Sequence, residues 1–225
     1  MALPVADTTK RSGIAFPPPP EDPPAGGGGW NGPDDADFPS ASPFLTNAQL
    51  AMLVLIAAEV MFFAGLIGAF LVFRFSGRPW PPPFQPRLPV GLTTANTILL
   101  LASSWTMIQA QRGLRRGDRA MLLRFLGATG ALGALFLLIQ GFEWLRLLSF
   151  GLTASSGVYA STFYTIIGTH GFHVFCGVLW LLVILARAAA GAYSPRRRGA
   201  VVACGMYWHL VVGLWPVLFV LVYLI

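Results

Sequence analysis

The sequence predicts an all-α protein that crosses a membrane with five helices. Apolar residues make up 55% of the 225 residues and charged residues only 11%, whereas soluble domains carry about 25% charged residues. Each of five apolar segments is long enough for a span, which needs about 20 residues. No alternation typical of strands is visible, so helices are expected to satisfy the backbone in lipid. The expected spans are 45–75, 89–111, 120–144, 163–186 and 201–225.

The first 43 residues differ in composition from the rest of the chain. They contain four consecutive prolines at 17–20, four glycines at 26–29 and an acidic patch at 34–37. Such a segment cannot bury enough apolar surface to form a core. We therefore expect a Pro/Gly-rich cytoplasmic tail over 1–43 ahead of a helix bundle over 44–225. The tail is either flexible or an extended arm that docks on a neighbouring subunit, and docking is the preferred interpretation.

The basic residues indicate orientation rather than nucleic-acid binding, despite a net charge of +6. They cluster in short loops beside the spans, where the excess of Lys and Arg marks the cytoplasmic side. With the N-terminus inside, 11 basic residues lie inside and 4 outside, which favours N-in and C-out. The inside group is Lys10, Arg11, Arg112, Arg115, Arg116, Arg119, Arg124, Arg187, Arg196, Arg197 and Arg198, and the outside group is Arg74, Arg78, Arg87 and Arg146.

Two of the three histidines lie inside the fourth expected span. His170 and His173 are spaced i, i+3, which predicts one helix face. Polar rings in hydrocarbon are costly and usually find a partner. Glu59, the carboxylate deep in the first span, lies at a similar depth at about 1.5 Å of rise per residue. We predict a buried polar contact, structural or regulatory, between Glu59 and His173 or His170.

A metal or haem site is not expected in this chain. The third histidine, His209, lies nearer the inner end of its span than His170 and His173, so the three do not converge. Two histidines on one helix cannot clamp a haem from both sides. Cys176 and Cys204 are expected to be small core residues rather than metal ligands.

Other polar and aromatic residues in the spans are candidates for lipid or subunit contacts. Near the outer end of the third span, Gln140 and Glu143 can face the bundle or reach the interface, and an interface position costs Glu143 little. Asn96 with Thr97 is expected to make interhelical hydrogen bonds. Aromatic residues early in the last span are typical of interfacial anchors. The candidates are Tyr207, Trp208, His209, Gln140, Glu143 and Asn96.

The same residues, in this order, resemble subunit III of the haem–copper oxidases, the cytochrome c oxidase subunit III family, in its short five-helix bacterial form. The resemblance covers about residues 45–225. It rests on Glu59 followed by Val-Met-Phe-Phe-Ala-Gly, Asn96-Thr97, Leu100-Leu101-Ala102-Ser103, Gln140 with Glu143, and Gly157-Val-Tyr-Ala-Ser-Thr-Phe163. It continues with His170-Gly-Phe-His173-Val174 with Gly177, Tyr207-Trp208-His209 and Trp215.

The resemblance implies an accessory role without a redox centre. Haems and copper would belong to subunits I and II of an aerobic terminal oxidase that reduces oxygen to water and pumps protons. The chain would pack on subunit I, bind phospholipid, and support proton uptake and sustained turnover, with Glu59 as the linked carboxylate. It would lie in the bacterial cytoplasmic membrane.

Two departures from the family pattern stand out. Longer members have seven helices where this chain has five. An aspartate often follows the last histidine by three residues, and that position here is Val212.

Several alternatives stay open at this point. The oxidase can use cytochrome c or quinol, or the chain can belong to a nitric-oxide-reductase-associated homologue. A haem-bearing membrane anchor and a transporter are disfavoured, the second because repeat symmetry and pore-type charges are missing from the sequence.

Overall fold

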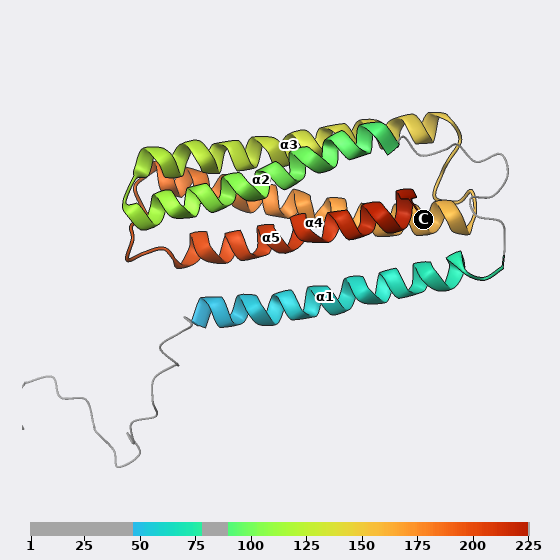
Figure 1. Cartoon of the computed structure of the whole chain (residues 1–225), viewed down its shortest axis with the longest axis horizontal. Coiled ribbons are helices and arrows are strands. Elements are labelled where there is room, and N and C mark those ends of the chain that lie inside the picture. The colour runs from blue at the N-terminus through green and yellow to red at the C-terminus, as the bar shows by residue number, and fades with distance from the viewer. Residues whose placement is uncertain (1–46, 78–89, 225) are drawn as a thin grey trace, which may run out of the picture. The chain divides into compact units, whose positions relative to one another are not determined.

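The computed structural model describes residues 47–77 and 90–224 and contains five α-helices (Figure 1). They are α1 (Asn47–Arg74), α2 (Val90–Arg116), α3 (Arg119–Ser149), α4 (Val158–Ala189) and α5 (Gly199–Phe219). A short π-helical turn, η1 (Val220–Leu224), continues α5. The described residues contain no strand, which confirms the predicted all-α class. The expected N-terminal tail lies outside the described residues.

Helices α2 to α5 pack in a closed ring, in the order α2, α3, α4, α5 and back to α2. Helix α1 packs along α5, with a smaller contact to α4, and lies apart from α2 and α3 (Figure 1). Much of its apolar surface is therefore exposed, including Val54, Met61 and Val72. The predicted contact between Glu59 of α1 and the histidines of α4 would therefore lie at a sparsely packed interface.

Four of the five helices are long and apolar enough to cross a membrane by length and composition, and α2 is the exception. Helix α2 has sufficient length, but it carries a row of polar side chains. These residues are buried against the neighbouring helices: Thr93, Asn96, Thr97, Ser103 and Thr106. The polar side chains of α2 therefore face the interior of the helix ring. Helices α2, α3 and α4 extend beyond the predicted spans, because α2 ends at Arg116, α3 ends at Ser149 and α4 begins at Val158.

A row of hydrogen bonds joins α2 to α5. On α2 the partners are hydroxyl groups, and on α5 they are ring nitrogens. From Thr97 to Ser103 on α2 the partner on α5 changes from Trp215 back to Trp208, as expected for an antiparallel pair. The bonds are Trp215 Nε1 to Thr97 Oγ1 at 2.9 Å, Trp208 Nε1 to Ser103 Oγ at 3.1 Å, and a contact between His209 Nδ1 and Ser104 Oγ. Such bonds between helices replace the hydrophobic driving force that lipid does not supply.

The indole ring of Trp208 occupies a slot that two glycines create. A Cβ added at Gly133 of α3 would lie 2.5 Å from Trp208 Cη2, and one added at Gly177 of α4 would lie 3.0 Å from Cε3. Trp208 is fully buried as a result. The indole ring of Trp208 therefore fills the space between α3 and α4. A side chain at Gly133 would force a shift, and one at Gly177 would make a tight contact with the same ring.

Candidate functional site

The structure brings Glu59 of α1 and His173 of α4 together. Glu59 Oε2 lies 3.0 Å from His173 Nε2, and the two side chains are 20% and 15% exposed. His173 Nδ1 lies 2.7 Å from the carbonyl oxygen of Thr169 on the preceding turn. The imidazole therefore bridges its own helix backbone and the carboxyl group of a separate helix.

The backbone contact fixes the role of one ring nitrogen of His173. A carbonyl oxygen only accepts, so Nδ1 carries a hydrogen and donates it to Thr169. Nε2 then faces the carboxyl group of Glu59, and the two groups form an ion pair only when His173 is protonated. Such a pair is neutral overall, which limits the cost of placing it in a membrane.

Aromatic rings surround His173 and shield it. Phe63 meets the imidazole edge-on at 5.1 Å between ring centroids, with Phe62 at 6.3 Å and Phe172 at 6.1 Å. Tyr207 of α5 donates its hydroxyl to the carbonyl oxygen of His173 at 3.2 Å. Three helices, α1, α4 and α5, therefore meet at this residue.

His170 does not join this contact, so of the two histidines predicted as alternative partners of Glu59 it is His173 that fills the role. Its ring is fully buried and stacks on Trp215 at 5.0 Å between centroids, with Phe136 edge-on at 6.3 Å. Neither ring nitrogen has a hydrogen-bond partner among the described residues. The reason is angular: a step of three residues turns a helix by about 300°, so the second ring points roughly 60° away from the first.

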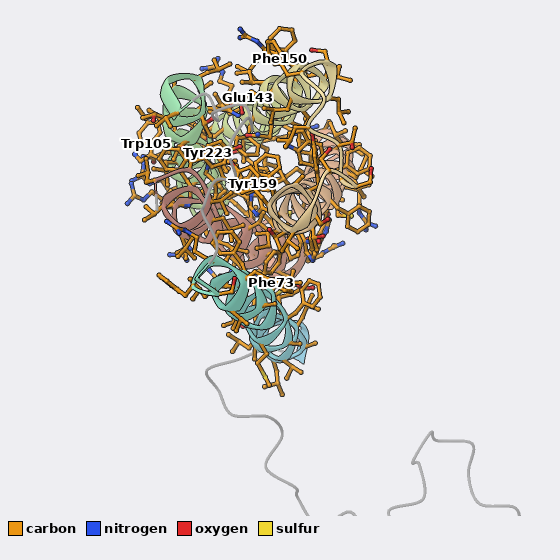
Figure 2. All side chains as sticks on the ribbon, turned by 90° about the vertical axis from the view of Figure 1, so that its right-hand side faces the viewer. Phe73, Trp105, Glu143, Phe150, Tyr159 and Tyr223 are labelled. Atoms are coloured by element: carbon orange, nitrogen blue, oxygen red, sulfur yellow. The ribbon has the colours of Figure 1, made fainter. Side chains whose placement is uncertain are left out.

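A second carboxyl group, that of Glu143, is buried rather than interfacial. It is 2% exposed, and Thr93 of α2 donates to its two oxygens at 3.0 and 3.2 Å. Gln140 donates its amide to Glu143 Oε2 at 2.9 Å and to the hydroxyl oxygen of Tyr223 at 3.2 Å. Figure 2 shows Glu143 and Tyr223 toward the inside of the bundle, with Trp105 and Phe150 at its periphery. The interface placement was wrong because it neglected these partners on α2 and η1.

The histidines and cysteines do not assemble a metal site. The described residues contain no group of three or more His, Cys, Asp or Glu able to hold a metal ion. The three histidines face three different neighbours, namely Glu59, Trp215 and Ser104. Cys176 and Cys204 are both free thiols. The three histidines therefore do not converge on one ion.

Comparison with known proteins identifies the family. The family model described as "Cytochrome c oxidase subunit III" matches residues 42–225. The chain belongs to this family. It is 39% identical to "Cytochrome c oxidase subunit 3" of Synechocystis sp., over 79% of this chain and 75% of the relative.

More distant organisms give the same result. "Probable cytochrome c oxidase subunit 3" of Mycobacterium leprae is 34% identical, over 79% of this chain and 87% of the relative. The pig (Sus scrofa) "Cytochrome c oxidase subunit 3" is 35% identical, over 78% of this chain and 68% of the relative. Subunit III family membership therefore spans the five helices, and the matched region includes the Glu59–His173 contact.

Six side chains of this subunit III family member were expected to contact lipid or another subunit, and five of them are buried inside the chain. Asn96 and Trp208 are fully buried, and Tyr207 is 8% exposed. Asn96 donates to the carbonyl oxygen of Phe136 at 3.2 Å, which confirms its predicted interhelical bond. Gln140 and Glu143 are buried in the cluster described above. These residues have no surface to offer a lipid or another subunit, and only His209 is half-buried.

Two partners in the Glu143 cluster escaped the sequence reasoning. Thr93 and Tyr223 sit at the beginning of α2 and near the end of η1, where threonine and tyrosine are unremarkable in sequence. The sequence did carry one signal: consecutive helices run antiparallel, so the start of α2 lies beside the end of α3 and the end of η1.

The prediction that Tyr207 and Trp208 anchor the chain at the membrane interface failed because both lie more than two turns inside α5, roughly 12 Å from its start.

Proposed function

We propose that this chain is the non-redox accessory subunit III of an aerobic terminal oxidase that takes electrons from cytochrome c, reduces oxygen to water and pumps protons. The family membership over 42–225 carries the proposal. Haems and copper would reside in subunits I and II, and this chain would pack on subunit I and bind phospholipid. The complex would lie in a bacterial cytoplasmic membrane with the N-terminus of this chain inside.

The Glu59–His173 contact is the residue pair that we assign to this role. It is the one ion-pair contact between a histidine and a carboxylate in the described part of the chain. Helix α1 packs mainly against α5, with a smaller contact to α4, so the pair ties a loosely packed helix to the ring. A shared proton at this position can move between carboxylate and imidazole without changing the charge of the pair. Both features suit a residue that supports proton uptake and sustained turnover rather than the redox reaction.

The test uses Glu59→Gln and Glu59→Ala in the purified oxidase complex. The glutamine keeps a polar contact to the bare Nε2 of His173, whereas the alanine leaves that nitrogen without a partner. We expect both variants to keep their initial oxidase activity, with the alanine variant inactivating after fewer turnovers than the glutamine variant. The measurement is oxygen consumption followed until activity stops. Immediate loss of activity in a correctly assembled complex would contradict the accessory role.

The electron donor needs a separate observation, because the donor docks on another subunit. A neighbouring subunit with a copper-binding cluster of Cys, His and Met would favour cytochrome c. Its absence from the purified complex would favour the alternative of a quinol oxidase or a nitric-oxide-reductase-associated homologue.

A further inference from the structure

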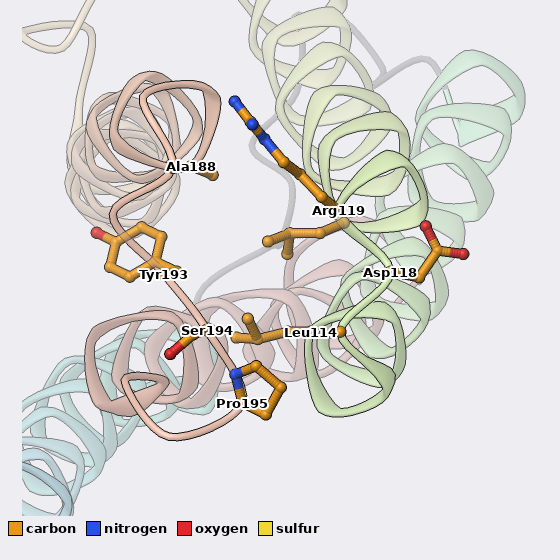
Figure 3. A pocket seen from close by; sticks show the side chains of 10 residues that line it. Leu114, Asp118, Arg119, Ala188, Tyr193, Ser194 and Pro195 are labelled. Carbon is orange, nitrogen blue, oxygen red and sulfur yellow. The ribbon is translucent and has the colours of Figure 1, made fainter.

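A pocket of about 280 Å³ lies at one end of the helix ring, between the α2–α3 turn and the α4–α5 loop (Figure 3). Its lining includes three buried apolar residues: Leu114 of α2, Leu122 of α3 and Ala188 of α4. Polar and exposed residues complete the lining, among them Arg119 and Ser194. The pocket therefore combines an apolar floor with a polar rim.

The end of the ring that carries this pocket is strongly basic. Arg119 itself donates to the carbonyl oxygen of Ala189 at the end of α4. Asp118, also in the pocket lining, is engaged in capping α3, because its carboxylate accepts from the backbone N–H of Met121 at 2.8 Å. Nine exposed arginines gather here, and none is paired with a carboxylate in the described part of the chain: Arg112, Arg115, Arg116, Arg119, Arg124, Arg187, Arg196, Arg197 and Arg198.

The position of the pocket decides between possible occupants. The lining residues come from both turns at the end of the ring, whereas the acyl chains of a phospholipid lie along the sides of membrane helices. The volume is also below the range of about 300–1,000 Å³ that is typical of small-molecule sites. An apolar floor with a cationic surround suits one apolar side chain flanked by acidic groups.

We propose that this pocket docks an acidic segment of another subunit. The segment inserts one apolar side chain over Leu114 and Leu122 and places carboxylates near Arg119 and the neighbouring arginines. The proposal rests on the proposed function in one respect, since the partner is expected in the same oxidase complex. It concerns a surface distinct from the Glu59–His173 contact.

The first test is photo-cross-linking in the intact, purified complex. A benzophenone amino acid replaces Ser194 at the pocket rim, and the same probe at Leu182, which is 51% exposed on α4, is the control. We expect the probe at position 194 to capture a peptide of another subunit with carboxylates beside an apolar residue, and the probe at 182 not to capture it. Adducts only with lipid, only with this chain, or with no acidic peptide would overturn the proposal.

The second test asks whether the charge and the cavity are both needed for this capture. Arg119→Gln removes the rim charge, and Arg112→Gln removes an equally exposed arginine outside the pocket lining. Arg119→Gln also removes the hydrogen bond to the carbonyl oxygen of Ala189, so a second variant is needed. Ala188→Leu fills the floor of the pocket and leaves every charge in place. We expect Arg119→Gln and Ala188→Leu each to lower the cross-link yield about tenfold, equivalent to about 1.4 kcal/mol, and Arg112→Gln to change it little. Unchanged yield in both pocket variants would refute the docking.

Oxidase activity of the same preparations keeps this test separate from the proposed function. A purified complex that contains no haem or copper would defeat the proposed function, while the cross-linking result would still decide whether an acidic segment docks here. An active oxidase whose position-194 probe captures no acidic peptide would defeat the docking alone.

Discussion

Replacing Gly133 by alanine should destabilise the bundle, although alanine is the better helix former. The new methyl group would lie 2.5 Å from Cη2 and 2.9 Å from Cζ2 of Trp208, and 3.1 Å from Cγ2 of Val178. Trp208 is fully buried and its Nε1 is held by Ser103, so the ring cannot withdraw without losing that bond. The clash must therefore be relieved by moving α3 away from α4 and α5.

The magnitude follows from two opposing terms. Overpacking a filled interior costs about 1–3 kcal/mol, and the change from glycine to alanine inside a helix returns about 1 kcal/mol. We expect a net loss of up to about 2 kcal/mol. In a domain of this size each kcal/mol shifts the melting temperature by about 2–4 °C, so the midpoint should fall by up to roughly 8 °C.

Gly130 supplies the matched control on the same helix. An added Cβ there meets nothing within 4 Å, so Gly130→Ala should be neutral or stabilising, by up to about 1 kcal/mol. Thermal unfolding of the detergent-solubilised protein measures both variants, and Gly133→Ala should cost less when it is added to Trp208→Leu than when it is added to the unchanged chain. Equal midpoints for Gly133→Ala and Gly130→Ala would refute the packing argument.

Two further predictions concern buried hydrogen bonds and use the same melting assay. Ser103→Ala leaves the indole N–H of Trp208 without its acceptor and should cost about 1–2 kcal/mol. In the Trp208→Phe background, where that N–H is already gone, Ser103→Ala should cost clearly less. If the costs of the two substitutions are fully additive, the hydrogen bond is contradicted. Glu143→Leu removes the carboxyl group that accepts from Thr93 and Gln140 and should cost about 1–3 kcal/mol, whereas Glu143→Gln keeps an acceptor and should cost less. Equal effects of the two changes would show that the carboxyl group is not bonded as described.

Depth along the spans was enough to predict a partner for Glu59 in the fourth helix. The rise per residue is nearly constant, so residues at equal distance from the same membrane face are predictable neighbours in height. Height does not specify the angle around the helix axis. His170 and His173 differ mainly in that angle, and the sequence could not indicate which ring faces α1 and which faces Trp215.

The buried polar residues of α2 show a second limit. A hydropathy pattern reports how polar a helix is, and it does not report which neighbour covers the polar side. Thr97 and Ser103 are covered by the indoles of Trp215 and Trp208, and this becomes visible only when α2 and α5 are placed side by side. The slot formed by Gly133 and Gly177 depends on the same arrangement of helices.

The central claim is that this chain is subunit III of a terminal oxidase, and purification through a tag on this chain tests it most directly. The account predicts that the purified material contains further subunits, shows haem absorption, contains copper, and reduces oxygen with reduced cytochrome c as donor. It also predicts that this chain, separated from those subunits, shows no haem absorption. A haem spectrum that stays with the isolated chain, or a purified complex with neither haem nor oxygen reduction, would contradict the account.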